Sequence, residues 1–337
     1  MTRRRLTLLA SAGVLLLAGV VAVQAYPIPP VPLWGLVAKA DLIVVAEVVE
    51  VAERDADEDD WNSAVARLEV IDALKGETGA SIEVPFPAGL MCPAPPHYEP
   101  GERVLAFLSR DDGGWRTVAL SYGTLYPDDE ALEDFRLLID RAIDLQTDEK
   151  AAERAPIDWL VRAAALPGTR WHGLYELAPW GDRIRSFYDR GDRRGRLGEL
   201  RPRHAELLAE SILRHAVDDP TLPQMLVVLA HHDDPRIDAL AAGVVEVGLR
   251  VDSEADPGEE QVPWWLRDVL GHTLLRYDVG EQDLGTTDAL FEEIESASLD
   301  RLRQIWADAK AELDLGEIEP VELDAVPYRP VGGRTPS

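Results

Sequence analysis

Short stretches of alternating apolar and polar residues fill the first third of the chain. The run Asp41–Val51 is rich in β-branched residues and too short for a stable helix, which favours a strand whose start is buried on both faces. In Val65–Ala73, the residues Ala66, Leu68 and Val70 fall on one face and charged residues on the other, as in a half-buried strand. Further strands are predicted at 81–86, 103–108 and 115–120.

Five short strands, with a long loop between the third and the fourth, predict a small antiparallel β-barrel of the OB type. The first strand follows Ala40-Asp41, the second ends in Leu74-Lys75-Gly76, a Cys-bearing loop comes next, and Pro100-Gly101-Glu102 precedes the fourth strand. Together these motifs resemble the netrin-module and tissue-inhibitor-of-metalloproteinases-like family over residues 33–123. The resemblance implies a protein-binding barrel.

The sequence departs from that family at its expected mature N-terminus. Family members commonly begin with a cysteine, and in the metalloproteinase inhibitors the amine and carbonyl of this residue chelate the zinc of the target. This chain is expected to begin at Tyr26 after cleavage behind Ala25, and no cysteine is present there. The inhibitory mechanism is therefore not carried over, and Cys92 lacks the partner that such a domain often provides.

Helical periodicity replaces the strand pattern after residue 126. Apolar residues recur at helical spacing from Leu132 to Ile143 behind the acidic start Asp128-Asp129-Glu130. Pro and Gly separate further amphipathic segments, which are predicted at 156–165, 171–188, 204–217, 222–231, 236–250, 263–276, 286–297 and 299–314. The stretch 233–244 resembles the start of the second helix of a HEAT-type repeat, in which Asp caps the helix and Pro occupies its first turn.

These patterns predict an α+β multidomain protein with four parts. The N-terminal residues 1–25 form a signal peptide, an OB-like barrel occupies 26–126, and an irregular α-helical, HEAT-like domain occupies 127–315. The Pro- and Gly-rich tail 316–337 is expected to be extended or disordered.

The first residues predict export to the periplasm or the medium. Three arginines precede the apolar run Leu6–Val23, and Val23-Gln24-Ala25 places small residues where a signal peptidase requires them. An uncleaved membrane anchor is the alternative, because the run is just long enough to span a bilayer. The arginines also fit a twin-arginine signal. After cleavage no membrane association is expected.

Composition limits the choice of partner. Loss of the leader arginines takes the formal net charge from −28 to −31, which opposes binding to nucleic acid and to anionic lipid. The chain has one cysteine, so no intramolecular disulfide can form and the fold depends on its hydrophobic core. The thiol of Cys92 is either buried and inert or available to a partner.

Three groups of side chains are candidates for chemistry or binding. The cluster His231, His232, Asp233 and Asp234 offers ligands for a metal such as zinc, although adjacent side chains rarely converge on one ion; the alternative is an interhelical loop with an Asp cap. An arginine-rich stretch contains Arg190, Arg193, Arg194 and Arg196, which either contact an anionic partner or are neutralised by neighbouring acids.

Tryptophans gather in the helical half, where they either form core contacts or line a groove for a peptide or glycan. They are Trp159, Trp171, Trp180, Trp264, Trp265 and Trp306. The sequence has no nucleophile elbow, phosphate loop, dinucleotide fingerprint or cysteine nucleophile with a local signature, so no catalytic residue and no cofactor is predicted. The predicted function is an exported, non-catalytic protein-binding module; the alternatives are a metal-dependent hydrolase and a glycan-binding envelope protein.

Overall fold

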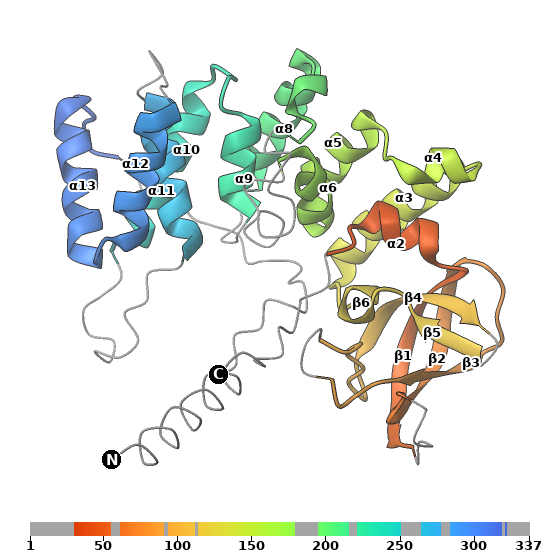
Figure 1. The fold of residues 1–337 in the computed structure, drawn as a ribbon. Helices are drawn as coiled ribbons and strands as arrows, with labels where there is room; N and C mark the ends of the chain where they lie inside the picture. The colour runs from red at the N-terminus through yellow and green to blue at the C-terminus, as the bar shows by residue number, and fades with distance from the viewer. Residues whose placement is uncertain are drawn as a thin grey trace, which may run out of the picture.

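The computed structural model of the chain describes residues 30–54, 61–90, 94–111, 114–178, 195–215, 221–250, 264–277, 284–318 and 321. Within these residues a nearly closed antiparallel barrel is followed by a helical half, which confirms the predicted fold class (Figure 1). The predicted signal peptide, with Ala25 and Tyr26, lies outside the described residues, as does Cys92. None of the described helices is both long and apolar enough to cross a membrane.

The barrel consists of six antiparallel strands in the order β3-β2-β1-β4-β5, with β6 also paired to β4. They are β1 (Leu42–Glu53), β2 (Ala64–Lys75), β3 (Ser81–Phe86), β4 (Arg103–Asp111), β5 (Gly114–Thr117) and β6 (Thr124–Leu125). β3 and β5 lie next to each other without pairing. Tyr98 bridges the gap between these two strands, because its ring packs on Phe86 of β3 and its hydroxyl lies 2.7 Å from Thr117 Oγ1 of β5.

The first half of β1 is buried on both faces, as its apolar run predicts. Val44 and Ala46 point into the barrel, whereas Ile43 and Val45 lie on the outer face and belong to the core of the helical half. The neighbouring strand β4 is divided in the same way, with Leu105 on the helical side. A strand without a polar face is stable here because helices cover the outside of the barrel.

The predicted alternation of β2 is confirmed up to a β-bulge. Ala66 and Leu68 are buried inside the barrel, and Val70 packs against the same cluster. Ile71 has no partner on β1, because Val45 pairs with Asp72 and Ala46 pairs with Val70. The extra residue reverses the alternation, so Leu74 packs against the helical core.

A short helix that the sequence patterns did not predict joins the two halves. Helix α2 (Leu33–Lys39) precedes β1, and its indole Trp34 Nε1 donates to the carbonyl of Ala152 at 2.8 Å. The backbone N–H of Leu33 donates to Nδ1 of His172 at 3.1 Å, and Lys75 Nζ donates to the carbonyl of Val37 at 2.7 Å. Helix α2 is thereby bonded to the barrel on one side and to the helical half on the other.

The described helices behind the barrel are the predicted ones, with ends that differ by a few residues, and one short helix at Glu149–Glu153 that the sequence patterns did not predict. They are α3 (Asp129–Leu145), α4 (Glu149–Glu153), α5 (Ile157–Ala165), α6 (Arg170–Leu177), α8 (Pro202–Arg214), α9 (Thr221–Val228), α10 (Pro235–Gly248), α11 (Trp264–Tyr277), α12 (Leu284–Ser296) and α13 (Leu299–Glu312). The carboxylate of Asp128 accepts a hydrogen bond from the N–H of Ala131, so the acidic start of α3 is an N-cap. The segment predicted at 171–188 is helical as far as Leu177, and residues 179–188 lie outside the described part.

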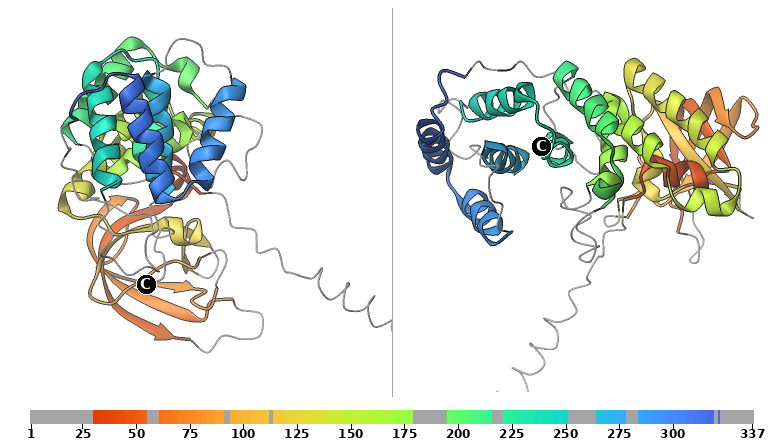
Figure 2. Two further views of the ribbon diagram at one scale, coloured as in Figure 1. Left: turned by 90° about the vertical axis from the view of Figure 1, so that its left-hand side faces the viewer. Right: turned by 90° about the horizontal axis from the view of Figure 1, so that it is seen from above.

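The helices from α5 onward form two layers. One layer contains α5, α8, α10 and α13, and the other contains α6, α9, α11 and α12 (Figure 2). Helices of successive pairs contact each other within each layer, and α5 with α6, α8 with α9 and α10 with α11 contact across the layers. Stacked helix pairs agree with the predicted helical half, and the resemblance of one segment to a HEAT-type repeat stays a prediction.

Candidate functional site

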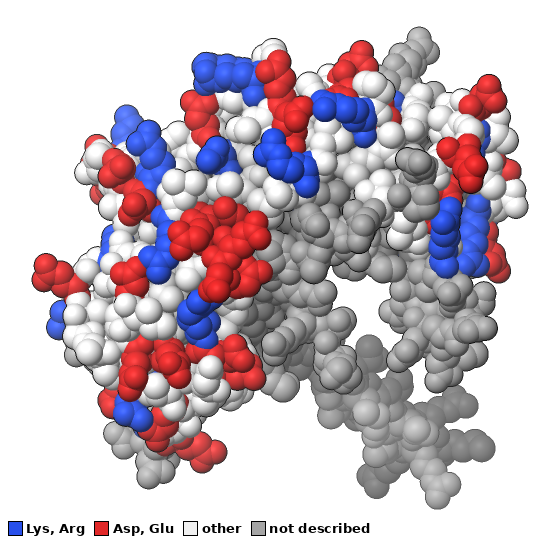
Figure 3. Space-filling view, turned by 180° about the vertical axis from the view of Figure 1, so that it is seen from behind, with Lys and Arg blue, Asp and Glu red and all other residues white. Residues whose placement is uncertain are grey.

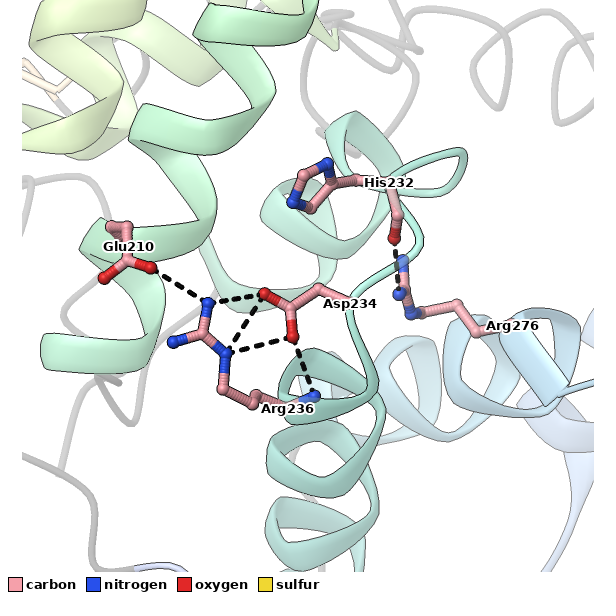
Figure 4. Close-up of polar contacts among 5 residues, drawn as sticks. All are labelled: Glu210, His232, Asp234, Arg236 and Arg276. Atoms are coloured by element: carbon pink, nitrogen blue, oxygen red, sulfur yellow. Dashed lines mark hydrogen bonds and ion pairs between the residues drawn. The ribbon is translucent and has the colours of Figure 1, made fainter.

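The candidate metal cluster is the loop between α9 and α10 (Figure 4). Asp234 is the N-cap of α10, with Pro235 in the first turn, and its carboxylate accepts hydrogen bonds from the backbone N–H and the guanidinium of Arg236. These bonds lower the pKa of Asp234 to about 2. Arg236 also donates to Glu210 of α8 at 2.9 Å. The loop therefore has the Asp-capped structure of the alternative interpretation.

Arg276 of α11 holds the same loop from its other side. Its guanidinium donates to the carbonyl oxygens of Leu229 and His232, at 2.5 and 3.1 Å, and to Asp238 Oδ1 at 2.6 Å. His231 and Asp233 are exposed. Across the described ranges no group of three or more His, Cys, Asp or Glu side chains is placed to hold a metal ion. The geometry of His231–Asp234 gives no support to a hydrolase site.

Arginines from neighbouring helices bond to helix C-termini at four places in the stack. Arg276 reaches the end of α9, and Arg170 donates to the carbonyl of His215 at the end of α8. Arg303 donates to the carbonyl of Leu249 behind α10, and Arg267 donates to two carbonyls at the end of α12. A helix C-terminus carries partial negative charge and unpaired carbonyls, so each arginine ties one helix pair to its neighbour.

The arginine-rich stretch is described only from Gly195 onward, and Arg190, Arg193 and Arg194 lie outside it. Arg196 is 12 % exposed, and its guanidinium bonds to the carboxylate of Glu199 and to the carbonyl of Ala155. The hydrogen bonds to Glu199 raise the pKa of Arg196. Arg196 is thus neutralised by the chain itself, as one of the two sequence interpretations predicts.

Two of the four described tryptophans of the helical half are buried core residues, and the other two are half-buried. Trp159 packs edge to face on Trp34, and both are buried. Trp306 is buried and donates to Glu246 at 2.9 Å. Trp171 and Trp265 are half-buried, and Trp180 and the side chain of Trp264 lie outside the description. A glycan-binding row of exposed rings is not formed by these residues.

The described motifs that resemble the netrin family lie at two places along β1: Asp41 and Gly76 at its start, and Gly101 beside Val48. Gly76 has a φ of +77°, and a Cβ there would lie 2.4 Å from the carbonyl oxygen of Asp41. The carboxylate of Asp41 accepts a hydrogen bond from the N–H of Arg110 at 2.8 Å. Gly101 has a φ of +87° behind Pro100 and occupies the turn position that requires glycine. Gly76, Asp41 and Gly101 thus each have a conformational reason within this barrel.

Comparisons with protein families, curated proteins and solved structures find no match to this chain. The resemblance to the netrin module therefore stays a prediction that rests on its motifs. The distribution of charge on the surface gives information that is independent of these comparisons. Figure 3 shows carboxylates gathered in broad patches over the barrel side of the molecule, whereas both signs of charge mix over the helices.

One face of the barrel remains uncovered by helices. We call it the outer sheet face, and it consists of three cross-strand rows on β1, β2 and β3. The rows are Ala52, Val65 and Pro85; Glu50, Arg67 and Glu83; and Glu47, Glu69 and Ser81. Trp61 precedes β2 next to the first row, and 77 % of its surface is exposed.

The outer sheet face is not apparent from the sequence alone. Its rows become visible only when the strand register is known, because Glu47 and Glu69 are separated by a whole hairpin. The signal available in the sequence was the alternation of charged residues along β2, together with a tryptophan directly in front of that strand. Neither observation alone places the residues side by side.

Proposed function

We propose that this protein is an exported, non-catalytic binding module for another exported protein, with a netrin-like barrel as its binding domain. The exposed Trp61 at the end of the uncovered outer sheet face carries the proposal. Tryptophan is the residue type most enriched at the energetic centres of protein interfaces, and burial of its ring contributes a large apolar area. Because 77 % of the surface of Trp61 is exposed, the residue contributes little buried apolar area to the stability of the fold.

The architecture supports the proposal by making the binding face rigid. The outer side of β1 and β4 belongs to the same hydrophobic core as α3 and α5, and α2 is hydrogen-bonded to both halves. A preorganised surface loses little conformational entropy on association. Stacked helix pairs also form extended surfaces in many interaction scaffolds, so the helical half can enlarge the contact area.

Export is tested by mass spectrometry of the protein produced in its native host. A mature chain that begins at Tyr26 in the envelope or medium fraction supports the proposed localisation, and an intact leader in the cytoplasm contradicts it.

Partner binding is tested by crosslinking and affinity capture from the native envelope fraction, with the mature wild-type chain and its Trp61→Ser variant in parallel. One stoichiometric exported protein that is retained by the wild-type chain and lost from the variant supports the proposal. Retention of nothing beyond background, or equal retention by both chains, contradicts it. The matched control is Leu137→Ser, which alters another exposed apolar side chain, 49 % exposed on α3.

A further inference from the structure

The outer sheet face contains an arrangement that is unfavourable for the barrel alone. Glu47 of β1 and Glu69 of β2 are direct cross-strand partners, and both are exposed. Like charges in directly opposite positions destabilise a sheet. Natural sequences usually place an opposite charge or a neutral residue in one of the two positions, so this pair calls for a reason beyond folding.

The nearest basic residue on β4 does not relieve the pair. Arg103 is the partner of Glu47 on the other side of β1, but its guanidinium contacts Asp129 of α3 at 2.6 Å. In the next row, Arg67 contacts Glu50 at 3.0 Å. Arg103 and Arg67 therefore each have a carboxylate partner other than Glu47 or Glu69.

The first row provides apolar surface on the same face as the acidic pair, with the row of Glu50, Arg67 and Glu83 between them. Ala52, Val65 and Pro85 lie side by side on the outer face, and Trp61 stands at the same end of the hairpin. Pro85 also lacks an N–H, so the row offers contact area without an additional backbone donor at this edge. Along the strands, the outer sheet face thus begins with an apolar row, continues with a row of mixed charge and ends with the acidic pair.

We propose that the outer sheet face binds a basic, amphipathic segment of the partner protein. The apolar side of that segment covers Trp61 and the row of Ala52, Val65 and Pro85, and a lysine or arginine of the segment lies between Glu47 and Glu69. The electrostatic repulsion within this pair is relieved only in the complex. The inference rests on the proposed function and adds to it the location of the surface and the charge of the partner.

The test uses a short fluorescein-labelled amphipathic peptide of lysine, leucine and alanine as the probe, titrated with the mature chain in anisotropy measurements at low salt. The face variant is Glu47→Gln/Glu69→Gln. Its matched control is Asp140→Asn/Glu206→Gln, which removes two exposed carboxylates from α3 and α8 and changes the net charge equally. We expect the face variant to weaken binding about tenfold and the control to leave it nearly unchanged.

A second variant separates binding from folding. Glu69→Lys places opposite charges in the cross-strand pair, so we expect a higher thermal midpoint together with loss of probe binding. Absence of probe binding to the wild-type chain, or equal weakening by the face and control variants, overturns the inference. If the envelope partner is captured equally by the wild-type chain and by Glu69→Lys, the inference fails while the proposed binding function stands.

Discussion

Replacement of Arg276 by methionine tests whether the arginines at helix ends hold the stack together. The Arg276 side chain is 6 % exposed and donates to Asp238 and to two backbone carbonyls. Methionine keeps the aliphatic length but leaves a carboxylate and two carbonyls without this donor. Removal of one partner from a buried charge pair costs about 3–5 kcal/mol, which is a large part of the typical 5–15 kcal/mol stability of a domain.

The assay is urea unfolding followed by circular dichroism, with the free energy of unfolding obtained by linear extrapolation. Arg236→Met is the control, because Arg236 contacts the same loop and has two carboxylate partners, but 59 % of its side chain is exposed. We expect a clearly smaller loss for the control, since water can replace the contacts of the exposed guanidinium and the backbone N–H of residue 236 still donates to Asp234. Arg276→Lys should give an intermediate loss, because a point charge cannot reach three acceptors.

A loss of less than about 1 kcal/mol for Arg276→Met, or a loss no greater than that of Arg236→Met, would contradict this role of Arg276. Hydrogen exchange gives an independent check on the location of the effect. We expect faster exchange in α9 and at the start of α10 in the Arg276 variant, because these segments lose their tie to α11.

Two further predictions concern the interior. Gly173→Ala should destabilise the protein by about 2 kcal/mol or more, because the new Cβ would lie 2.4 Å from backbone atoms of Leu160 and Ala164. This cost outweighs the higher helix propensity of alanine. Urea unfolding measures the change in the free energy of unfolding, with Gly198→Ala as the control because no atom lies near that position. Burial lowers the pKa of His172 to about 3 in the folded protein. As the pH falls below about 6.5, this histidine is protonated in the unfolded chain while it stays neutral in the folded one. The free energy of unfolding should therefore fall by up to about 1.4 kcal/mol per pH unit towards pH 3. His172→Asn retains an acceptor without this titration, and a stability–pH slope equal to that of the wild type would contradict the assignment.

Local patterns in the sequence predict the strands and helices because burial of one face imposes a period. β1 has no period at its start, and its apolar run correctly predicts burial on both faces. The bulge at Ile71 leaves no such trace, since one extra residue does not change the local preference for a strand. Helix α2 is seven residues long, too short to show a helical period behind the prolines that precede it.

The candidate sites were harder to predict because they depend on long-range geometry. Arg276 acts on backbone carbonyls of another helix, and a carbonyl has no signature in the sequence. The histidines at 231 and 232 suggested a metal ligand set, whereas the Asp-Pro-Arg sequence behind them specifies a cap and its partner. The pairing of Glu47 with Glu69 depends on the register of a hairpin, which residue patterns alone do not determine.

The barrel and the helical half share one hydrophobic core. The change of pattern at residue 126 marks where strands give way to helices, but Ile43, Val45, Leu105 and Phe107 on the barrel are buried against the helical half. Burial of four such side chains contributes roughly 6–12 kcal/mol, comparable to the whole stability of a small domain. A single cysteine allows no intramolecular disulfide, so the stability of the barrel depends on hydrophobic contacts, including those with the helices that cover β1 and β4. The same cover leaves the outer sheet face as the part of the barrel that is free for a partner.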